Sequence, residues 1–502
     1  MPFRSYLLTL TVALAACAPS RAQPALPDGF EAALDSVVAD EMASNHVPGA
    51  AVVVVRDGEV LFQRGYGVAD VATGRPVDPD RTLFRIGSIT KALTGLAVTR
   101  LVDDGRLAWD TPAARFTDAI ENRSGSDAPV TVWNLLTHTG GFDQIGLDRR
   151  VREYELSLAD RKALRPGLGE WLEDGNLRRV TPPSRQFNYD TYGISLAGLV
   201  LARATGRSYA EAMREELFAP LGMNDSYVEV DEGRFGDLAV GYGWVDGAYV
   251  AQPYELYMSL PASSIDATPA DMGRLMQALT NGGANARGRL FSAEATAAVL
   301  APQFRPHPDF VGATHGFQET PASPGPDGRV WAVDHGGTML GYKSLLAFYP
   351  ESNVAVFAVG NRDAEAGGDG VNLGSRVAAL VRDRLVDVPA GPPYRGPYRA
   401  AAPDRDVDLS QYEGQIVGGT YCHACTDEEL ARGAWRRGQG ATVRAEDGRL
   451  LIGENAFLPT ADDDVFVHEG GGAELYFGRD AEGRVAFLVA SDSPNSFELV
   501  HD

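Results

Sequence analysis

Residues 50–55 restrict the fold more than any other stretch of the sequence. They are two alanines followed by four valines, a short apolar run with no polar side chain. A run of this length and β-branched content predicts a buried strand. Residues 56–59 read Arg-Asp-Gly-Glu, which is a turn pattern, and residues 60–66 predict the strand that returns beside the first. Helical apolar spacing at 32–45 predicts a helix in front of this antiparallel hairpin.

The chain continues with a helical part and then returns to strands. Residues 88–104 have apolar side chains at helical spacing, and helix and loop patterns prevail from about 107 to 242. The clearest helices of that part are 132–136 and 194–204. Strand patterns return at 330–334, 343–349 and 354–361. Residues 371–385 predict a closing helix, so we expect the first and last strands to share one antiparallel sheet flanked by helices, with a helical subdomain inserted.

Length and composition indicate two domains. A chain of 502 residues with 44% hydrophobic residues is too long for one core. The stretch 388–408 is rich in proline, arginine and alanine and has no periodicity, which predicts a linker. We expect a large α/β domain at 23–387 and a small β domain at 409–502. Short strand patterns of the second domain fall at 450–452, 465–468, 475–477 and 485–489.

The first 22 residues predict an export signal. A charged start precedes an apolar stretch at 7–16 that is too short to span a bilayer. Residues 14–17 read Leu-Ala-Ala-Cys and resemble a bacterial lipobox, in which Cys17 is lipidated and becomes the first mature residue. Cleavage after Ala22 is the alternative. We expect an exported protein, periplasmic or held at the outer membrane by a lipid on Cys17, with secretion as the alternative.

The net charge limits the partners of this chain. Its formal charge is −23 and its isoelectric point is near 4.8, so no basic footprint remains to neutralise phosphates. We therefore expect no nucleic acid partner and no direct binding to an anionic membrane surface. A lipid on Cys17 would be the membrane contact.

Lysine is scarce in this chain. Only three of the 45 basic residues are lysines, namely Lys91, Lys162 and Lys343. Arginine keeps its proton at any ordinary pH, whereas a desolvated lysine can become a neutral amine, so chemistry that needs a free amine cannot replace lysine by arginine. Lys162 lies between arginines on a predicted helix surface, and evolutionary drift is enough to explain a lysine there. Lys91 calls for a chemical explanation.

Ser88 and Lys91 are a candidate nucleophile and proton acceptor. On one helix, a serine three residues before a lysine places both side chains on the same face, about one turn apart. A serine in the first turn also lies at the positive end of the helix dipole, which favours a developing oxyanion. A desolvated lysine can lower its pKa enough to accept the serine proton.

Four motifs extend this pair in one order along the chain. Residues 84–91 read Phe-Arg-Ile-Gly-Ser-Ile-Thr-Lys, 135–141 read Leu-Leu-Thr-His-Thr-Gly-Gly, 187–189 read Phe-Asn-Tyr and 335–338 read His-Gly-Gly-Thr. With them the sequence resembles the β-lactamase-related serine hydrolases, which include class C β-lactamases, low-molecular-weight penicillin-binding proteins, D-amino-acid peptidases and esterases. The similarity covers about residues 30–385. It implies the β-lactamase/transpeptidase-like α/β fold (α+β), with an antiparallel sheet and a helical subdomain.

The resemblance implies a role for Tyr189. It occupies the place of the tyrosine in the family's Tyr-x-Asn element, whose oxygen faces the serine and the lysine, and it is thereby the expected general base or proton relay. Thr191 stands where the family usually has asparagine. An amide able to hydrogen-bond a substrate carbonyl is then absent, which argues against a specificity for β-lactams and peptides.

The resemblance also implies the groups of the strand that lines the site. The family's Lys-Thr-Gly element is replaced by His335, Gly336 and Gly337, and the two glycines are expected to let the substrate approach the strand. His335 would face the substrate or its leaving group without the permanent charge of a lysine. The peptide N–H groups of Ser88 and Thr338 are the expected oxyanion hole.

Several further residues have more than one possible role. Lys343 is either a nearby positive charge or a solvated lysine at a strand end, and His138 is best explained as a hydrogen-bonded structural histidine. Cys422 and Cys425 are a candidate disulfide, with a redox pair or half of a metal site as alternatives. Zinc would need two more ligands, so we predict no metal and no cofactor.

These residues together predict an exported serine hydrolase that acts through an acyl-enzyme on Ser88. The expected substrate is a small-molecule ester or amide or a peptide, as for an esterase or a D-amino-acid peptidase. A D-Ala-D-Ala carboxypeptidase or β-lactamase is the alternative within the enzymes. A non-catalytic envelope protein that binds or senses a partner is the alternative of another class.

Overall fold

The structure is a computed structural model of the chain. It describes residues 25–143, 150–151, 153–174, 177–321, 330–362, 373–387, 401–402, 405, 407–417, 441–470, 473–480, 482–490 and 496–500. Cys17, Cys422 and Cys425 lie outside the described residues, as does most of the predicted linker. The signal peptide and the domain boundaries therefore stay predictions.

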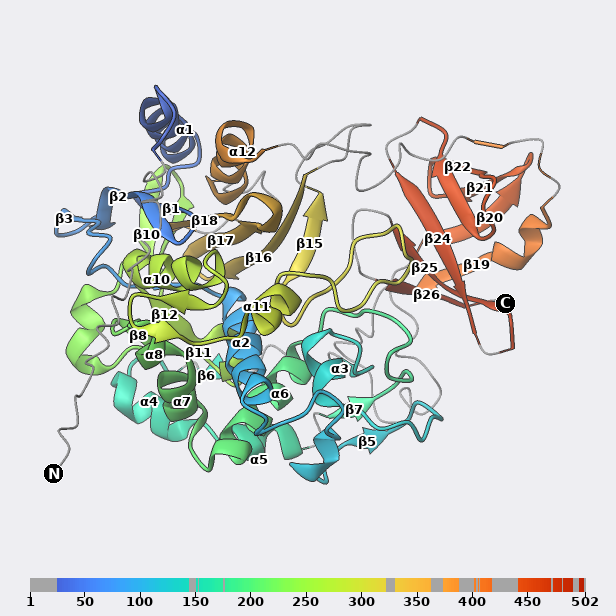
Figure 1. The fold of residues 1–502 in the computed structure, drawn as a ribbon, viewed down its shortest axis with the longest axis horizontal. Helices are drawn as coiled ribbons and strands as arrows, with labels where there is room; N and C mark the ends of the chain where they lie inside the picture. The colour runs from blue at the N-terminus through green and yellow to red at the C-terminus, as the bar shows by residue number, and fades with distance from the viewer. Residues whose placement is uncertain are drawn as a thin grey trace, which may run out of the picture.

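A seven-stranded sheet forms the centre of the large domain, in the order β15-β16-β17-β18-β1-β2-β3 (Figure 1). Strand β1 (Gly49–Arg56) pairs antiparallel with β2 (Glu59–Asp70) on one side and with β18 (Val354–Gly360) on the other. The prediction that the first and last strands share one sheet is confirmed. The remaining strands of this sheet are β3 (Arg75–Pro76), β15 (Gln318–Pro321), β16 (Trp331–Met339) and β17 (Tyr342–Tyr349).

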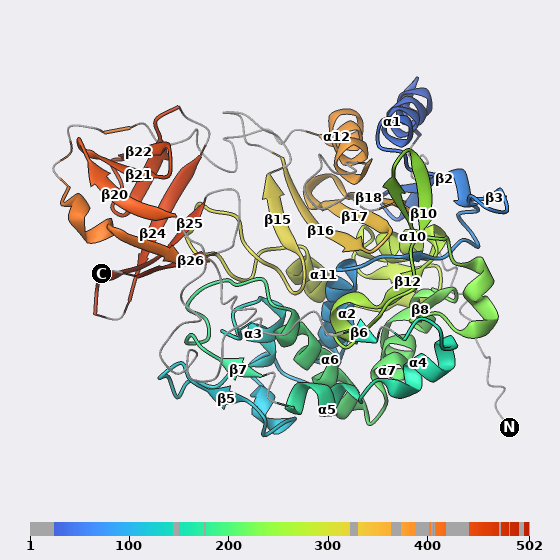
Figure 2. The same ribbon diagram turned by 180° about the vertical axis from the view of Figure 1, so that it is seen from behind.

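Both faces of the central strand β1 are buried, which explains its unbroken apolar sequence. Val52 and Val54 pack under helices α1 (Phe30–Ser44) and α12 (Leu373–Leu385), which cover one face of the sheet (Figure 2). Val53 and Val55 belong to the core of the opposite face, with helices α2 (Ile89–Asp103) and α10 (Pro269–Leu279). Each buried valine contributes about 1.5–3 kcal/mol to the free energy of unfolding.

The helical subdomain covers the α2 side of the sheet. Its longest helix is α6 (Thr191–Thr205), which begins three residues before the predicted start and ends at Gly206 with φ of 68°. The other helices outside the sheet layer are α3 (Val132–Leu136), α4 (Leu158–Leu164), α5 (Leu168–Glu173), α7 (Tyr209–Met213), α8 (Ala219–Leu221), α9 (Leu260–Ser263) and α11 (Ala293–Val299). Small sheets of two or three short strands link them; their strands are β4 (Phe84–Arg85), β5 (Glu121–Asn122), β6 (Arg150–Val151), β7 (Arg178–Arg179), β8 (Ser226–Val228), β9 (Tyr242–Val245), β10 (Ala248–Ala251), β11 (Leu256–Tyr257), β12 (Ile265–Ala267), β13 (Ala284–Asn285) and β14 (Gly288–Arg289).

The C-terminal part forms a closed eight-stranded barrel beside the large domain (Figure 1). Its strands are β19 (Gly414–Val417), β20 (Thr442–Glu446), β21 (Arg449–Ile452), β22 (Asn455–Pro459), β23 (Val465–His468), β24 (Glu474–Arg479), β25 (Val485–Ala490) and β26 (Ser496–Val500). Alternate residues fill its interior, among them Leu450, Phe477 and Leu488. The predicted small β domain is thereby confirmed.

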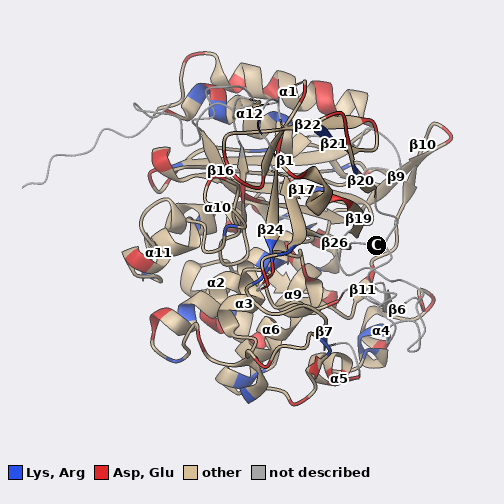
Figure 3. Ribbon diagram, turned by 90° about the vertical axis from the view of Figure 1, so that its right-hand side faces the viewer, with Lys and Arg blue, Asp and Glu red and all other residues tan. Residues whose placement is uncertain are grey.

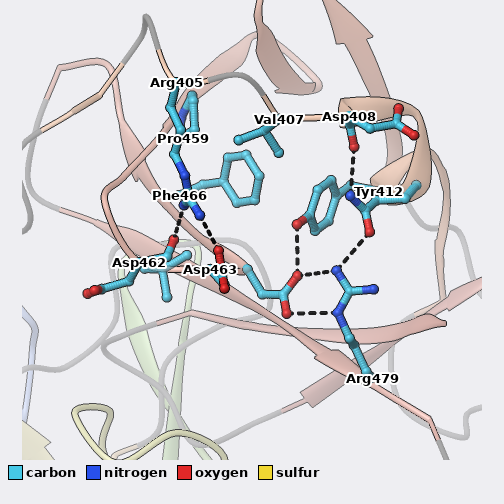
Figure 4. Close-up of a pocket in the computed structure, with 12 residues that line it drawn as sticks. Arg405, Val407, Asp408, Tyr412, Pro459, Asp462, Asp463, Phe466 and Arg479 are labelled. Carbon is cyan, nitrogen blue, oxygen red and sulfur yellow. Dashed lines mark hydrogen bonds and ion pairs between the residues drawn. The ribbon is translucent and has the colours of Figure 1, made fainter. Parts of the chain in front are cut away.

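A polar hollow of about 350 Å³ opens on this barrel (Figure 4). Four of its charged groups form two ion pairs: Asp464 accepts from the Tyr412 hydroxyl at 2.7 Å and forms an ion pair with Arg479 at 2.6 Å. Arg405 pairs with Asp463 at its rim. Because these side chains satisfy each other, they form a structural network that lines the hollow of the barrel.

Charged side chains lie mainly on the outer helices and turns, while the strands of the central sheet are largely uncharged (Figure 3). None of the helices in the described ranges combines the length and apolar composition needed to cross a bilayer.

Candidate active site

Ser88 and Lys91 meet at the start of helix α2. Ser88 is the N-cap residue, its side chain makes no capping bond, and it is half-buried. The Nζ of Lys91 donates to Ser88 Oγ at 3.2 Å and to the carbonyl of Ala262, in helix α9, at 3.0 Å. Lys91 is only 1% exposed, so its amine is held among protein groups and not in water. The predicted contact between these two side chains is confirmed.

The segment before Ser88 is fixed by a buried ion pair. Arg85, in β4, lies 3.5 Å from Asp266 in β12, and both side chains are buried. The guanidinium of Arg85 also lies 4.1 Å from the ring centroid of Tyr254. Removing one partner of such a pair leaves an uncompensated buried charge, so the pair holds the strand that leads to the nucleophile. Ser344 adds a bond to the carbonyl of Ile86 at 3.0 Å.

Tyr189 closes the site over the lysine. The Nζ of Lys91 lies 4.8 Å from the centroid of the Tyr189 ring, a cation–π distance. Tyr189 is half-buried and therefore remains reachable from solvent. Thr191, the residue that replaces the family's asparagine, is the first residue of helix α6.

His138 holds the loop that carries Tyr189. Its Nδ1 accepts from the peptide N–H of Asp190 at 2.9 Å, and its carbonyl accepts from that of Asn188 at 2.9 Å. Its ring is stacked on the Tyr189 ring, with centroids 4.9 Å apart. The interpretation of His138 as a hydrogen-bonded structural histidine is confirmed. The contact of its ring with Tyr189 was not predicted from the sequence. Burial, aided by the charge of Lys91, lowers its pKa well below the ordinary value and keeps Nδ1 free to accept.

The strand β16 brings Thr338 beside the nucleophile. A Cβ built on Gly87, whose φ is +55°, would lie 2.8 Å from the Thr338 nitrogen, so the two backbones are in close contact. A Cβ on Gly337 would meet the Ile86 carbonyl at 2.0 Å, so glycine is needed there for packing against the Ser88 segment. The expectation that both glycines make room for substrate is therefore wrong for Gly337. Gly336 has an open, exposed face.

Strand β16 is an edge strand only in its second half. Strand β15 pairs with residues 331–334, and within the described ranges no strand pairs with residues 335–339 on that side. The His-Gly-Gly-Thr element therefore lies at an edge of the sheet in the described part of the chain, next to β15, which was not predicted. Lys343 lies opposite Thr338 in the neighbouring strand β17.

His335 is a neutral histidine in this site. It is 5% exposed, its ring centroid lies 5.9 Å from that of Tyr189, and its Nδ1 lies 2.7 Å from the carbonyl of Gly336. Because a carbonyl only accepts, Nδ1 carries the proton and Nε2 keeps a lone pair, which has no hydrogen-bond partner among the described groups. Burial and the charge of Lys91 lower the pKa of His335 to about 4.

The structure therefore brings Ser88, Lys91, Tyr189, His335 and Thr338 together from three separate segments, namely the start of helix α2, the loop before helix α6 and strand β16. Within the described part of the chain, no three His, Cys, Asp or Glu side chains gather in a way that would hold a metal ion. The motif that contains His138 was the available signal for its place near the site, but nothing in the motif indicates that it holds the Tyr189 loop.

The comparison with protein families agrees with this geometry. The family model described as Beta-lactamase matches residues 34–380. The chain therefore belongs to the Beta-lactamase family, a family of serine hydrolases.

Curated relatives match part of the chain, and two of them illustrate the range of identity. Esterase EstB of Burkholderia gladioli is 36% identical over 214 residues, which are 41% of this chain and 53% of EstB. Protein flp of Staphylococcus aureus strain MRSA252 is 27% identical over 211 residues, 42% of this chain and 40% of that protein. The matched region thus spans about half the length of these relatives or less.

Solved structures share the fold over more of the chain. The octameric penicillin-binding protein homologue from Pyrococcus abyssi has a TM-score of 0.58 and 21% identity, covering 93% of this chain and 99% of its own. SurE with D-Leu has a TM-score of 0.61 and 22% identity, covering 94% and 100%. The β-lactamase/D-alanine carboxypeptidase from Pseudomonas syringae has a TM-score of 0.55 and 21% identity but covers only 72% of this chain and 100% of its own.

Proposed function

We propose that this chain hydrolyses uncharged carboxylic esters through an acyl-enzyme on Ser88. The observation that supports this most is the 3.2 Å hydrogen bond between the Lys91 amine and Ser88 Oγ, at a lysine that is almost fully buried. A nucleophile in contact with a desolvated amine is the arrangement that makes a serine reactive.

The proposed reaction has two halves. Ser88 Oγ attacks the ester carbonyl while its proton moves towards Lys91 and Tyr189, and the oxyanion accepts hydrogen bonds from the peptide N–H groups of Ser88 and Thr338. Collapse of this intermediate breaks the bond to the alcohol, which leaves with the proton. Water then attacks the acyl carbon by the same path and releases the acid. A single oxyanion donor typically contributes about 2.7–4 kcal/mol to such a barrier. No cofactor takes part in these steps.

The neutral state of His335 favours an ester over a substrate with a carboxylate. His335, which stands where related enzymes have a lysine, is neutral because its pKa lies at about 4. Thr191 offers no amide to a peptide carbonyl. The similarity to Esterase EstB supports the same choice.

The test is hydrolysis by purified wild-type protein and by Ser88→Ala. We expect the wild type to hydrolyse nitrophenyl acyl esters faster than D-amino-acid peptides or nitrocefin, and Ser88→Ala to lose this activity. Full ester hydrolysis by Ser88→Ala would refute the proposal. Preferred turnover of a D-amino-acid peptide would keep the nucleophile but change the substrate class. A stable adduct on Ser88 without product release would favour a sensor.

We further propose that the protein is exported and anchored through a lipid on Cys17, on the pattern of residues 14–17 alone. Cys17→Ala is expected to move the protein from the membrane fraction to the soluble periplasmic fraction. Equal fractionation of both forms would contradict the anchor.

A further inference from the structure

The barrel presents a row of residues to the large domain. Tyr476 of β24 lies opposite Val489 of β25, and Val489 lies opposite Ser496 of β26. We call these three residues the docking row. In Figures 1 and 2, strands β25 and β26 lie on the side of the barrel that faces the large domain, where the loop between α11 and β15 reaches them.

The docking row is on the outer surface of the barrel and is nevertheless covered. Leu475, Phe477 and Leu488, which alternate with it along the strands, belong to the interior core. Outward-facing residues of a barrel normally meet solvent, yet Val489 is fully buried. The residue that covers it is Phe310 of the large domain, in one apolar cluster with Phe487. The barrel is therefore packed against the large domain through this face.

At one end of the row, Ser496 reaches the catalytic loop. Its peptide N–H donates to the carbonyl of Phe187 at 3.0 Å. With its amide nitrogen turned towards the neighbouring carbonyls, the Asn188 side chain donates to the carbonyl of Ser496 at 3.2 Å. Phe187 and Asn188 immediately precede Tyr189. Strand β26 thus forms hydrogen bonds to the backbone and side chain of the two residues that lead to the tyrosine.

The Tyr189 loop is consequently held from two sides. His138 binds the peptide N–H groups of Asn188 and Asp190 from within the large domain, while Ser496 binds Phe187 and Asn188 from the barrel. Phe187 is in edge contact with the His138 ring, with centroids 5.3 Å apart. Removing the barrel bonds leaves the carbonyl of the fully buried Phe187 without this donor.

We propose that strand β26 is a positioning element for Tyr189, and that Ser496 acts on the reaction through the loop at 187–189. This inference rests on the proposed role of Tyr189 as the proton relay. A shift of about 1 Å in a catalytic group can cost roughly 10²-fold in rate, so a bond that fixes the preceding residues affects turnover without touching substrate. The barrel then contributes to catalysis itself.

Ser496→Pro tests this directly, because proline lacks the N–H that Phe187 accepts and is tolerated at the first residue of a strand. We expect kcat for a nitrophenyl ester to fall about 10- to 100-fold while KM changes little. We also expect the pH dependence of kcat to shift, because the displaced tyrosine has new neighbours. Ser496→Ala keeps the N–H and is expected to retain the wild-type pH profile.

Phe310→Ala is the second variant, chosen because it loosens the docking row far from the Tyr189 loop. Phe310→Ala is expected to lower kcat and to shift the pH profile in the same direction as Ser496→Pro does. If Ser496→Pro does not fold, Phe310→Ala alone tests the positioning role of β26. A folded Ser496→Pro or Phe310→Ala with wild-type kcat and pH profile would overturn the inference. The Ser88→Ala variant in the same assay separates the two failures. If Ser88→Ala is inactive, wild-type behaviour of Ser496→Pro or Phe310→Ala overturns only the positioning role of β26 and leaves the proposed function intact. An active Ser88→Ala would refute the proposed function instead.

Discussion

The two halves of the candidate site are built in different ways. Ser88 and Lys91 are three residues apart on one helix, and their contact follows from helix geometry. Tyr189 is placed by contacts from distant parts of the chain, namely His138 below its ring and Ser496 in the barrel. The first half is a local property of the sequence, whereas the second is a property of the assembled fold. Substitutions in the two halves should therefore act differently.

The largest effect is expected for Lys91→Arg. Arginine keeps the positive charge but cannot give up its proton, so the variant separates charge from proton transfer. Proton transfer by a positioned side chain typically contributes about 10²–10⁴-fold, and we expect kcat/KM to fall about 10³-fold. Lys162→Arg is the matched control, because Lys162, on helix α4, donates to the carbonyls of Glu229 and Val230, which are no part of the proposed site, and this variant should keep full activity. Activity within a few-fold of wild type in Lys91→Arg would mean that only the charge matters.

The same contrast decides what the sequence could predict. The strand at 50–55 and the helix that begins after Ser88 follow from local patterns, and the structure confirms both. The resemblance correctly predicted that Tyr189 and the strand with His335 would come together with Ser88. The packing of Gly337 against Ile86, the role of His138 and the docking of the barrel depend on contacts between distant segments, which no local pattern records.

His138→Leu is expected to have an intermediate effect. The peptide N–H of Asp190 loses its acceptor and stays buried, which costs about 1–3 kcal/mol of unfolding free energy. Because the same bond holds the Tyr189 loop, we also expect kcat to fall about 10- to 100-fold. His315→Leu is the control, since His315 is likewise buried but stacks on Trp109, away from Tyr189. Denaturant unfolding and turnover are measured for both variants, and only His138→Leu should lose turnover. Equal turnover in the two would remove His138 from the account.

The smallest effect on rate is expected for His335→Gln. Because the pKa of His335 is about 4, its imidazole is neutral from pH 5 to 8, and its titration contributes no limb to the kcat/KM profile in that range. We therefore expect wild type and variant to have profiles of the same shape for a neutral ester. A limb between pH 5 and 8 that disappears in the variant would contradict this.

The protonation of His335 also affects the free energy of unfolding, and this effect is larger than its effect on the rate. The native imidazole resists the proton that the unfolded chain binds below its ordinary pKa near 6.5, so the wild type loses stability as the pH falls from about 6.5 to about 4. His335→Gln lacks this loss, so between the two pH values the wild type loses at most about 3 kcal/mol more unfolding free energy than the variant. Asp271 and Asp334, whose pKa values burial raises to about 6, act in the opposite sense but equally in both proteins. Urea unfolding of both proteins at pH 7 and pH 4.5 measures the difference.

The central claim is that Ser88 carries the acyl group during turnover. The most direct measurement is rapid acid quenching of the wild-type protein during hydrolysis of a nitrophenyl ester, followed by mass spectrometry of the peptide that contains residues 84–91. We expect this peptide to gain the mass of the acyl group on Ser88, and we expect Ser88→Ala to show neither adduct nor turnover. Turnover with the acyl group on another residue, or turnover that persists in Ser88→Ala, would contradict it.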